Sequence, residues 1–85
     1  MLTGQEPDID LKPGIYRHFK GANYEVLRLA RHSETEEWLV IYRQLYGDGA
    51  CWARPLQAFV EEVEVDGEKV PRFAWLSERP EKMLD

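Results

Sequence analysis

The sequence predicts a small all-β protein, an antiparallel β-barrel of five to six strands with at most one short helical turn. Residues with high strand propensity (Tyr, Val, Ile, Leu, Trp and Phe) come in short runs that Gly, Asp, Asn and Ser interrupt, as expected for strands joined by tight turns. The sequence contains no substantial helical segment. Closure into a barrel would also remove the exposed sheet edges that invite aggregation.

The first half of the chain predicts three strands, at residues 15–19, 24–31 and 38–45. The intervening sequences KGAN and HSETE are expected to turn the chain. The third strand carries apolar side chains on both of its faces, which predicts a central position covered on both sides. These side chains are Trp38, Val40 and Tyr42 on one face and Leu39, Ile41 and Leu45 on the other.

The second half predicts a short strand at residues 51–54, one helical turn at 55–59, and strands at 61–65 and 70–76. Pro55 suits the first position of the helical turn. Asp66-Gly67 lies between two alternating runs and is a strong hairpin signal. Pro71 cannot donate a hydrogen bond to a ladder, which favours an edge position for the last strand.

The length and the cysteine content indicate one cytoplasmic domain. Eighty-five residues suffice for a single modest core. We expect this domain to span residues 13–76, between a loose lead-in at 1–12 and a polar tail at 77–85. Cys51 is the single cysteine, whereas secreted chains of this size usually carry several disulfides. The acidic start predicts no signal peptide, and no apolar run approaches the ~20 residues that span a bilayer.

The charge is unevenly distributed along the sequence. The formal net charge of −5 divides into −3 over residues 1–11, +2 over residues 12–54 and −4 over residues 55–85. The central part is therefore mildly basic within an acidic protein. Binding to duplex DNA usually requires a stronger basic footprint, because neutralisation of phosphates supplies much of the affinity. The sequence therefore disfavours nucleic acid as a partner.

Two stretches of the sequence resemble a bacterial family catalogued as domain of unknown function 1653. They are residues 14–59, in which YRHFKG, ARHSETEE, LYGD and RPL occur in the order of the family, and residues 63–73, VEVDGEKVPRF. The resemblance covers about residues 12–76. It implies an SH3-type small barrel, and it implies no activity, because none is assigned to the family.

The two histidines, each preceded by an arginine, raise the question of a shared catalytic or metal site. Pairing Lys20 with Asn23 across KGAN would place His18 opposite Glu25. His32 would then lie about 23 Å from Glu25 along the same strand, too far for a joint metal site. His18 and Glu25 could form a general base with an orienting carboxylate. A solvated cross-strand pair is the favoured interpretation.

Three further patterns are interpreted as structural. The cluster of hydroxyls and a carboxylate at residues 32–35 fits a polar loop better than a Ser/His/acid triad. Cys51 has no base on its own side of the strand, and we expect a small core residue rather than a nucleophile. The acidic residues between 61 and 68 lack the spacing of a calcium loop and fit a solvated face.

Aromatic and basic residues provide the favoured candidate surface. Pairing across the turns would place Arg31 opposite Trp38, in position for a cation–π contact, and Arg54 near Tyr42. Exposed aromatic and arginine side chains anchor many protein ligands, and stacked rings beside positive charge also suit single-stranded nucleic acid. Alternatively, the rings fill the core, because alternation does not reveal which face is inside. The predicted ligand-binding residues are Tyr16, His18, Tyr42, Trp52 and Arg54.

The function remains unknown from the sequence, and three hypotheses stay open. The favoured one is a noncatalytic module that binds a peptide, a partner protein or a small ligand through the aromatic and arginine surface. The second is a small enzyme that uses His18 with Glu25, or Cys51. The third is a weak binder of single-stranded nucleic acid. No catalytic residue, metal site, cofactor or membrane association is predicted.

Overall fold

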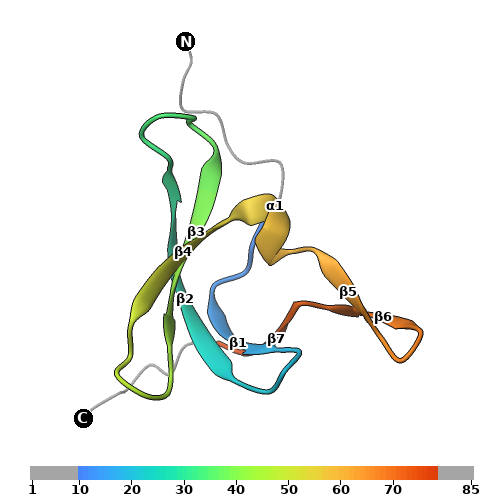
Figure 1. Cartoon of the computed structure of the whole chain (residues 1–85). Coiled ribbons are helices and arrows are strands. Elements are labelled where there is room, and N and C mark those ends of the chain that lie inside the picture. The colour runs from blue at the N-terminus through green and yellow to red at the C-terminus, as the bar shows by residue number, and fades with distance from the viewer. Residues whose placement is uncertain (1–9, 79–85) are drawn as a thin grey trace.

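The computed structural model describes residues 10–78, which form seven strands and one helical turn (Figure 1). The all-β class is thereby confirmed. The elements are β1 (Gly14–His18), β2 (Asn23–Arg31), β3 (Trp38–Gln44), β4 (Cys51–Pro55), α1 (Leu56–Phe59), β5 (Glu62–Val65), β6 (Glu68–Pro71) and β7 (Phe73–Ser77). No helix within the described residues has the length and apolarity needed to cross a membrane. The predicted lead-in and tail fall mostly on residues 1–9 and 79–85, outside the described residues.

The strands form two antiparallel sheets. The larger has the order β4-β3-β2-β1-β7, and the smaller consists of β5 and β6. Within residues 10–78, β4 and β7 are the edges of the larger sheet and do not pair, so the predicted closed barrel is not confirmed. In the chain, α1 and the β5–β6 hairpin lie between β4 and β7. Figure 1 shows this hairpin projecting away from the larger sheet.

The chain bends at Arg72, so the strand predicted at residues 70–76 is divided between two sheets. The backbone N–H of Arg72 donates to the carbonyl of Glu61 at 3.0 Å, and the carbonyl of Arg72 accepts from the N–H of Phe19 at 2.9 Å. Pro71 ends β6 and leaves one donor out of that ladder. These bonds fix Arg72 between the hairpin and β1, with its side chain beside the larger sheet.

An aromatic core lies between one face of the larger sheet and α1. Phe59 of α1 stacks on Phe73 of β7, with 4.1 Å between ring centroids. Tyr16 and Tyr42 each meet Phe59 edge-on at 5.4 Å. The buried apolar residues are Tyr16, Val26, Val40, Tyr42, Leu56, Phe59 and Phe73. Alternation along β1 and β3 brings these side chains to one face, as the strand period of two requires.

The β1–β2 register differs from the predicted one by three residues. Asn23 pairs with Arg17, not with Lys20. The loop is longer than a two-residue turn: the N–H of His18 donates to the carbonyl of Ala22, and the N–H of Gly21 donates to that of His18. A shift by an odd number of residues exchanges the two faces. Glu25 therefore pairs with Ile15, and His18 does not face Glu25.

Candidate ligand-binding site

All five predicted ligand-binding residues project from the same face of the larger sheet. Cross-strand neighbours in an antiparallel sheet share a face. The pairs that establish this face are Tyr16–Tyr24, Tyr24–Gln44, Val26–Tyr42, Tyr42–Trp52 and Val40–Arg54. His18 follows Tyr16 by two residues and pairs with Phe73. The face that carries the core therefore continues outward into a surface.

The five residues differ in their exposure. Tyr16 and Tyr42 are buried, each with 5% of its surface exposed, whereas Trp52 is 53% exposed. His18 and Arg54 are half-buried. Two of the predicted ligand contacts are thus core residues. They support the surface from below, and the part that solvent reaches is provided by His18, Trp52 and Arg54.

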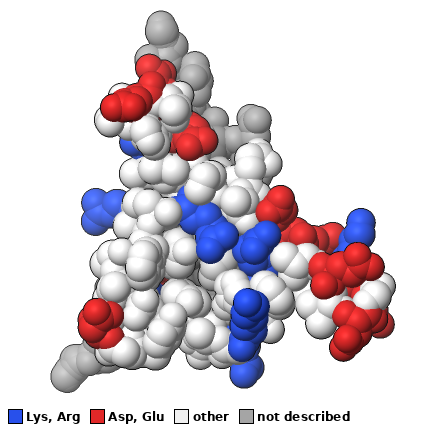
Figure 2. All heavy atoms as spheres, in the orientation of Figure 1, with Lys and Arg blue, Asp and Glu red and all other residues white. Residues whose placement is uncertain are grey.

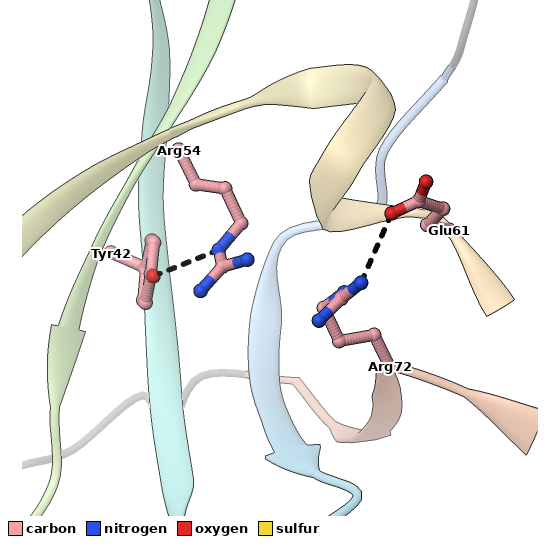
Figure 3. A network of polar contacts seen from close by, with 4 residues as sticks. All are labelled: Tyr42, Arg54, Glu61 and Arg72. Carbon is pink, nitrogen blue, oxygen red and sulfur yellow. Dashed lines mark hydrogen bonds and ion pairs between the residues drawn. The ribbon is translucent and has the colours of Figure 1, made fainter. Parts of the chain in front are cut away.

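Two arginines from distant parts of the chain extend toward the same space (Figure 3). Arg54 of β4 donates from Nε to the hydroxyl of Tyr42 at 3.3 Å, so the predicted proximity of Arg54 to Tyr42 is confirmed. Its Cζ lies 5.5 Å from the centroid of Phe73. Among the described residues, its two terminal nitrogens have no hydrogen-bond partner. A guanidinium group held at Nε with both terminal nitrogens available can donate two parallel hydrogen bonds to one oxyanion.

Arg72 approaches from the opposite side. Its terminal nitrogen forms an ion pair with a carboxylate oxygen of Glu61 at 3.0 Å. Its Nε is buried and has no hydrogen-bond partner among the described residues. A buried donor without a partner costs free energy. Arg54 and Arg72 both act electrostatically on His18, which places the two cations around the same imidazole.

His18 lies where the positive potentials of three side chains overlap. Its ring meets Phe73 edge-on at 4.9 Å, and its Nδ1 accepts from the backbone N–H of Lys20 at 3.1 Å. Burial lowers the pKa of His18 from its ordinary value, and the charges of Arg54, Arg72 and Lys20 lower this pKa further. At neutral pH the imidazole is therefore uncharged, and the surrounding cations remain available for an anion.

We expect the Arg54→Gln substitution to raise the pKa of His18, because it removes the cation whose charge lowers this pKa the most. A titration of the His18 imidazole signals by NMR measures the change, with the His32 signals as internal control. The lowered pKa of His18 stabilises the fold above about pH 6.5. This contribution is lost as the pH falls below that value, and the loss should be smaller in Arg54→Gln. An unchanged His18 titration would contradict the proximity.

Tyrosine rings form the floor beside His18. Tyr24 lies 5.4 Å from Tyr42 and 5.6 Å from Phe73, ring centroid to ring centroid. Its hydroxyl shares a hydrogen bond of 2.7 Å with that of Tyr46. This bond, together with burial, raises the pKa of Tyr24 to about 12. The Tyr24 hydroxyl is thus uncharged at physiological pH and does not repel an anion.

The opposite face holds Glu25 and Cys51, which corrects two expectations. Glu25 is buried and forms an ion pair with Arg43 at 2.7 Å, so the pairing of His18 with Glu25 is wrong. Cys51 pairs with Arg43 across β3–β4 and is exposed, so the expected core role of Cys51 is also wrong. The reason is that β4 is an edge strand, whose outer face nothing among the described residues covers.

The second histidine belongs to a loop at the far end of β2. Nδ1 of His32 accepts from the backbone N–H groups of Glu34 and Thr35, at 3.0 and 3.2 Å. Nearby, Arg31 lies over the ring of Trp38 at 4.4 Å, and the predicted cation–π contact is confirmed. Residues 10–78 contain no group of three or more His, Cys, Asp and Glu side chains arranged to hold a metal ion.

Sequence reasoning missed Arg72 and Lys20 as members of this basic cluster. Both lie in segments where the chain changes direction, Lys20 in the KGAN turn and Arg72 directly after Pro71. In the sequence, each is only a basic residue next to a turn residue, and this pattern is too common at protein surfaces to indicate a site. Only the fold reveals that the charges of both side chains act on His18 together with that of Arg54.

Comparison with known proteins identifies the family but no activity. Residues 14–75 match the family described as "Protein of unknown function (DUF1653)". The fold matches the crystal structure of a protein of this family from Bordetella bronchiseptica, with a TM-score of 0.76 and 37% sequence identity. The match covers 86% of this chain and 96% of that one. No curated protein is significantly similar to the chain. The chain therefore belongs to the DUF1653 family.

Proposed function

We propose that this protein is a noncatalytic binding module that holds an anionic group, a carboxylate or a phosphate, between Arg54 and Arg72. The observation that carries the proposal is the convergence of Arg54, Arg72 and Lys20 on one uncharged histidine, in a chain whose net charge is −5. Cations that repel one another in a half-buried place gain most from a ligand of opposite charge.

The geometry of the two arginines suits a planar oxyanion. Tyr42 orients the guanidinium of Arg54, and Glu61 orients that of Arg72. Each contact fixes the side chain and leaves other donors available, so less conformational entropy is lost when a ligand binds. Phe73 beside Arg54 limits the access of water to the charge of that arginine.

The distribution of charge favours a compact anion over a nucleic acid strand. Figure 2 shows Lys and Arg side chains gathered over the middle of this face and acidic side chains toward its periphery. Much of the periphery is the β5–β6 hairpin, where Glu62, Glu64, Asp66 and Glu68 are all exposed. A polyanion that crossed the face would meet these carboxylates, whereas a small anion in the middle would not.

The geometry contradicts the enzyme hypothesis that pairs His18 with Glu25. Catalysis by a histidine and an orienting carboxylate needs the two groups within hydrogen-bond reach. Glu25 instead pairs with Arg43 on the other face, and Nδ1 of His18 accepts from a backbone N–H. Binding without reaction is the simpler use of such a site.

The finer expectations about fold and location belong to the same proposal. A five-stranded antiparallel sheet with a single helical turn supports an SH3-type module, in which β4 and β7 remain unpaired. The lone free cysteine supports a cytoplasmic location. The structural neighbour from Bordetella bronchiseptica supports a bacterial origin.

The proposal is tested by adding inorganic phosphate and sodium acetate and following the His18 imidazole signals by NMR. We expect saturable shifts and a rise in the pKa of His18, because the bound anion offsets the neighbouring cations. Arg54→Gln should weaken binding at least fivefold. The matched control is Arg28→Gln, which removes an exposed arginine from the opposite face of β2 and should leave binding unchanged. Anions that leave His18 unaffected would refute the proposal.

Single-stranded nucleic acid is the second candidate, because Trp52 and Tyr46 are exposed on the same face, with 53% and 47% of their surfaces accessible. Both rings could stack on bases. Oligothymidylate is the probe. If it binds with an affinity that falls steeply with salt and depends on Trp52, the second candidate replaces the first.

A further inference from the structure

Two large aromatic side chains lie exposed on the face that carries the basic cluster. Trp52 of β4 is 53% exposed, and Tyr46, in the loop after β3, is 47% exposed. Trp52 belongs to this face through its pairing with Tyr42. Tyr46 reaches it through the ring of Tyr24, with 5.6 Å between ring centroids. Single exposed rings are common at protein surfaces, whereas neighbouring ones more often mark a binding site.

Gln44 connects the two exposed residues and fixes them in place. Its side-chain oxygen accepts from the indole N–H of Trp52 at 2.7 Å, and its amide nitrogen donates to the backbone carbonyl of Tyr46 at 3.3 Å. The hydroxyl of Tyr46 is held in turn by that of Tyr24 at 2.7 Å. Rings that are held in one orientation before binding lose less conformational entropy when a ligand covers them.

Arg54 places a cation beside these rings. It follows Trp52 by two residues in β4, so both side chains project from the same face, with Cα atoms about 6.6 Å apart at the ordinary rise of a strand. Its Nε donates to the hydroxyl of Tyr42, and the ring of Tyr42 lies 5.4 Å from that of Tyr24 (Figure 3). The cation and the exposed rings are therefore parts of one continuous surface.

We infer that the ligand is a small aromatic carboxylate, whose carboxylate binds at Arg54 and whose ring stacks on the exposed rings of Trp52 and Tyr46. This inference rests on the proposed function and specifies its ligand class. The terminal nitrogens of Arg54 suit the planar carboxylate, and the flat faces of the exposed side chains suit a planar ring. The spacing of about 6.6 Å between Trp52 and Arg54 favours a ring joined to the carboxylate directly or through one carbon atom.

The test compares four probes: sodium acetate, sodium phenylacetate, sodium cyclohexylacetate and 2-phenylethanol. NMR signals of the His18 ring report on the basic cluster, and the indole N–H signal of Trp52 reports on the exposed rings. The indole signal of Trp75, on the other edge strand, is the internal control. We expect phenylacetate to shift both reporter signals and to bind at least fivefold more tightly than acetate, because stacking on an aromatic side chain supplies roughly that factor or more. Acetate should shift His18 alone.

The two remaining probes separate the contribution of charge from that of the aromatic ring. 2-Phenylethanol keeps the ring without a carboxylate and should bind more weakly than phenylacetate, because it lacks the charge that Arg54 recognises. Cyclohexylacetate keeps the carboxylate and an apolar body of similar size. It should bind at least twofold more weakly than phenylacetate, because a saturated ring cannot stack.

Two variants separate the two halves of the site. Trp52→Thr removes an exposed ring and retains a residue with high strand propensity. It should weaken phenylacetate at least threefold and leave acetate unchanged. Arg54→Gln should weaken both carboxylates at least fivefold and leave 2-phenylethanol unchanged. The matched control is Trp75→Leu, which removes an exposed tryptophan from the other edge strand and should affect neither. Circular dichroism confirms that each variant keeps the wild-type fold.

The outcomes distinguish this inference from the proposed function. If acetate and phenylacetate bind equally and shift His18 alone, the cluster binds anions without the exposed rings, and the inference is wrong. If 2-phenylethanol or cyclohexylacetate binds as tightly as phenylacetate, binding does not require both the carboxylate and the aromatic ring, which also overturns it. If no carboxylate shifts His18, the proposed function fails as well.

Discussion

Replacing Phe59 with alanine is expected to lower the free energy of unfolding by about 3–5 kcal/mol. Phe59 is 1% exposed and stacks on Phe73 at 4.1 Å. It also meets Tyr16 and Tyr42 edge-on. A domain of this length has a total stability of roughly 4–13 kcal/mol. The Phe59→Ala protein is therefore expected to lie close to its unfolding transition at room temperature.

Urea denaturation followed by circular dichroism measures this loss, and the midpoint should fall with little change in slope. Gln57→Ala is the matched control, because Gln57 lies on the same helical turn and is exposed. Its effect should stay within about 0.5 kcal/mol. Phe59→Leu keeps part of the buried volume and should cost less than Phe59→Ala. A loss for Phe59→Ala of less than about 1 kcal/mol would contradict the central position of this ring.

The effect of Phe59 matters for the candidate site as well. Phe73 contacts Phe59 in the core and also lies beside His18 and Arg54. The core ring therefore supports the surface on which the anion would bind. A loosened core is expected to weaken binding even though Phe59 itself is inaccessible to a ligand.

Local features of the sequence were sufficient to predict most elements. The five segments predicted from residue 15 to residue 59 appear with boundaries that differ by at most one residue. The hairpin at Asp66-Gly67 is also confirmed, with both residues at positive φ, 53° and 82°. These predictions depend on residue preferences and turn chemistry, which neighbouring positions determine.

The β1–β2 register and the closure of the barrel depend on contacts between distant residues. The predicted register was wrong, and the predicted closure is not confirmed. The loop after β1 includes Phe19, whose N–H donates to the carbonyl of Arg72, more than fifty residues later. That contact favours a longer loop over a two-residue turn across Gly21. The alternating pattern of β1 and β2 fits either register, because each offers one buried face. Pairing with the C-terminal part of the chain thus accompanies the register that places Glu25 on its face.

The candidate site was predictable only in part for the same reason. Arg54 and Tyr42 belong to adjacent strands, so their proximity followed from pairing across one turn. Arg72 reaches the site through the bend between β6 and β7, which no local pattern indicated. The burial of Tyr16 and Tyr42 follows from α1 covering that face. Alternation alone left the inner face undetermined.

Net charge was a poor guide to the chemistry of the surface. The negative total arises from exposed carboxylates on the hairpin and on the loop after β2, as well as from the terminal segments. Three of the cations, Arg54, Arg72 and Lys20, in contrast act together on His18. Because salt screens exposed charges beyond about 8–10 Å, the distant carboxylates barely reduce the local potential at the cluster. The local positive potential of the cluster therefore governs the binding of a small anion, whereas the net negative charge of the protein also affects a long polyanion.

The second large effect is expected at Gly14, where alanine should lower the free energy of unfolding by about 2–3 kcal/mol. Gly14 has a φ of +136°, a conformation that side chains disfavour. A Cβ atom there would lie 2.4 Å from the carbonyl oxygen of Ser77 and 2.8 Å from Nε1 of Trp75. The first of these atoms belongs to the backbone and cannot rotate away. Relief requires the end of β7 to move from β1.

Gly21→Ala separates the two causes of this loss. Gly21 also has a positive φ, +112°, but no atom lies within 4 Å of its added Cβ. Its substitution therefore measures backbone strain without a clash. Urea denaturation of both variants should give a clearly larger loss for Gly14→Ala, and the difference reports the steric term. Equal losses of unfolding free energy would mean that β7 moves away from Gly14 with little loss of stability. The close contact between β1 and β7 at Gly14 would then not be what positions Phe73 beside His18.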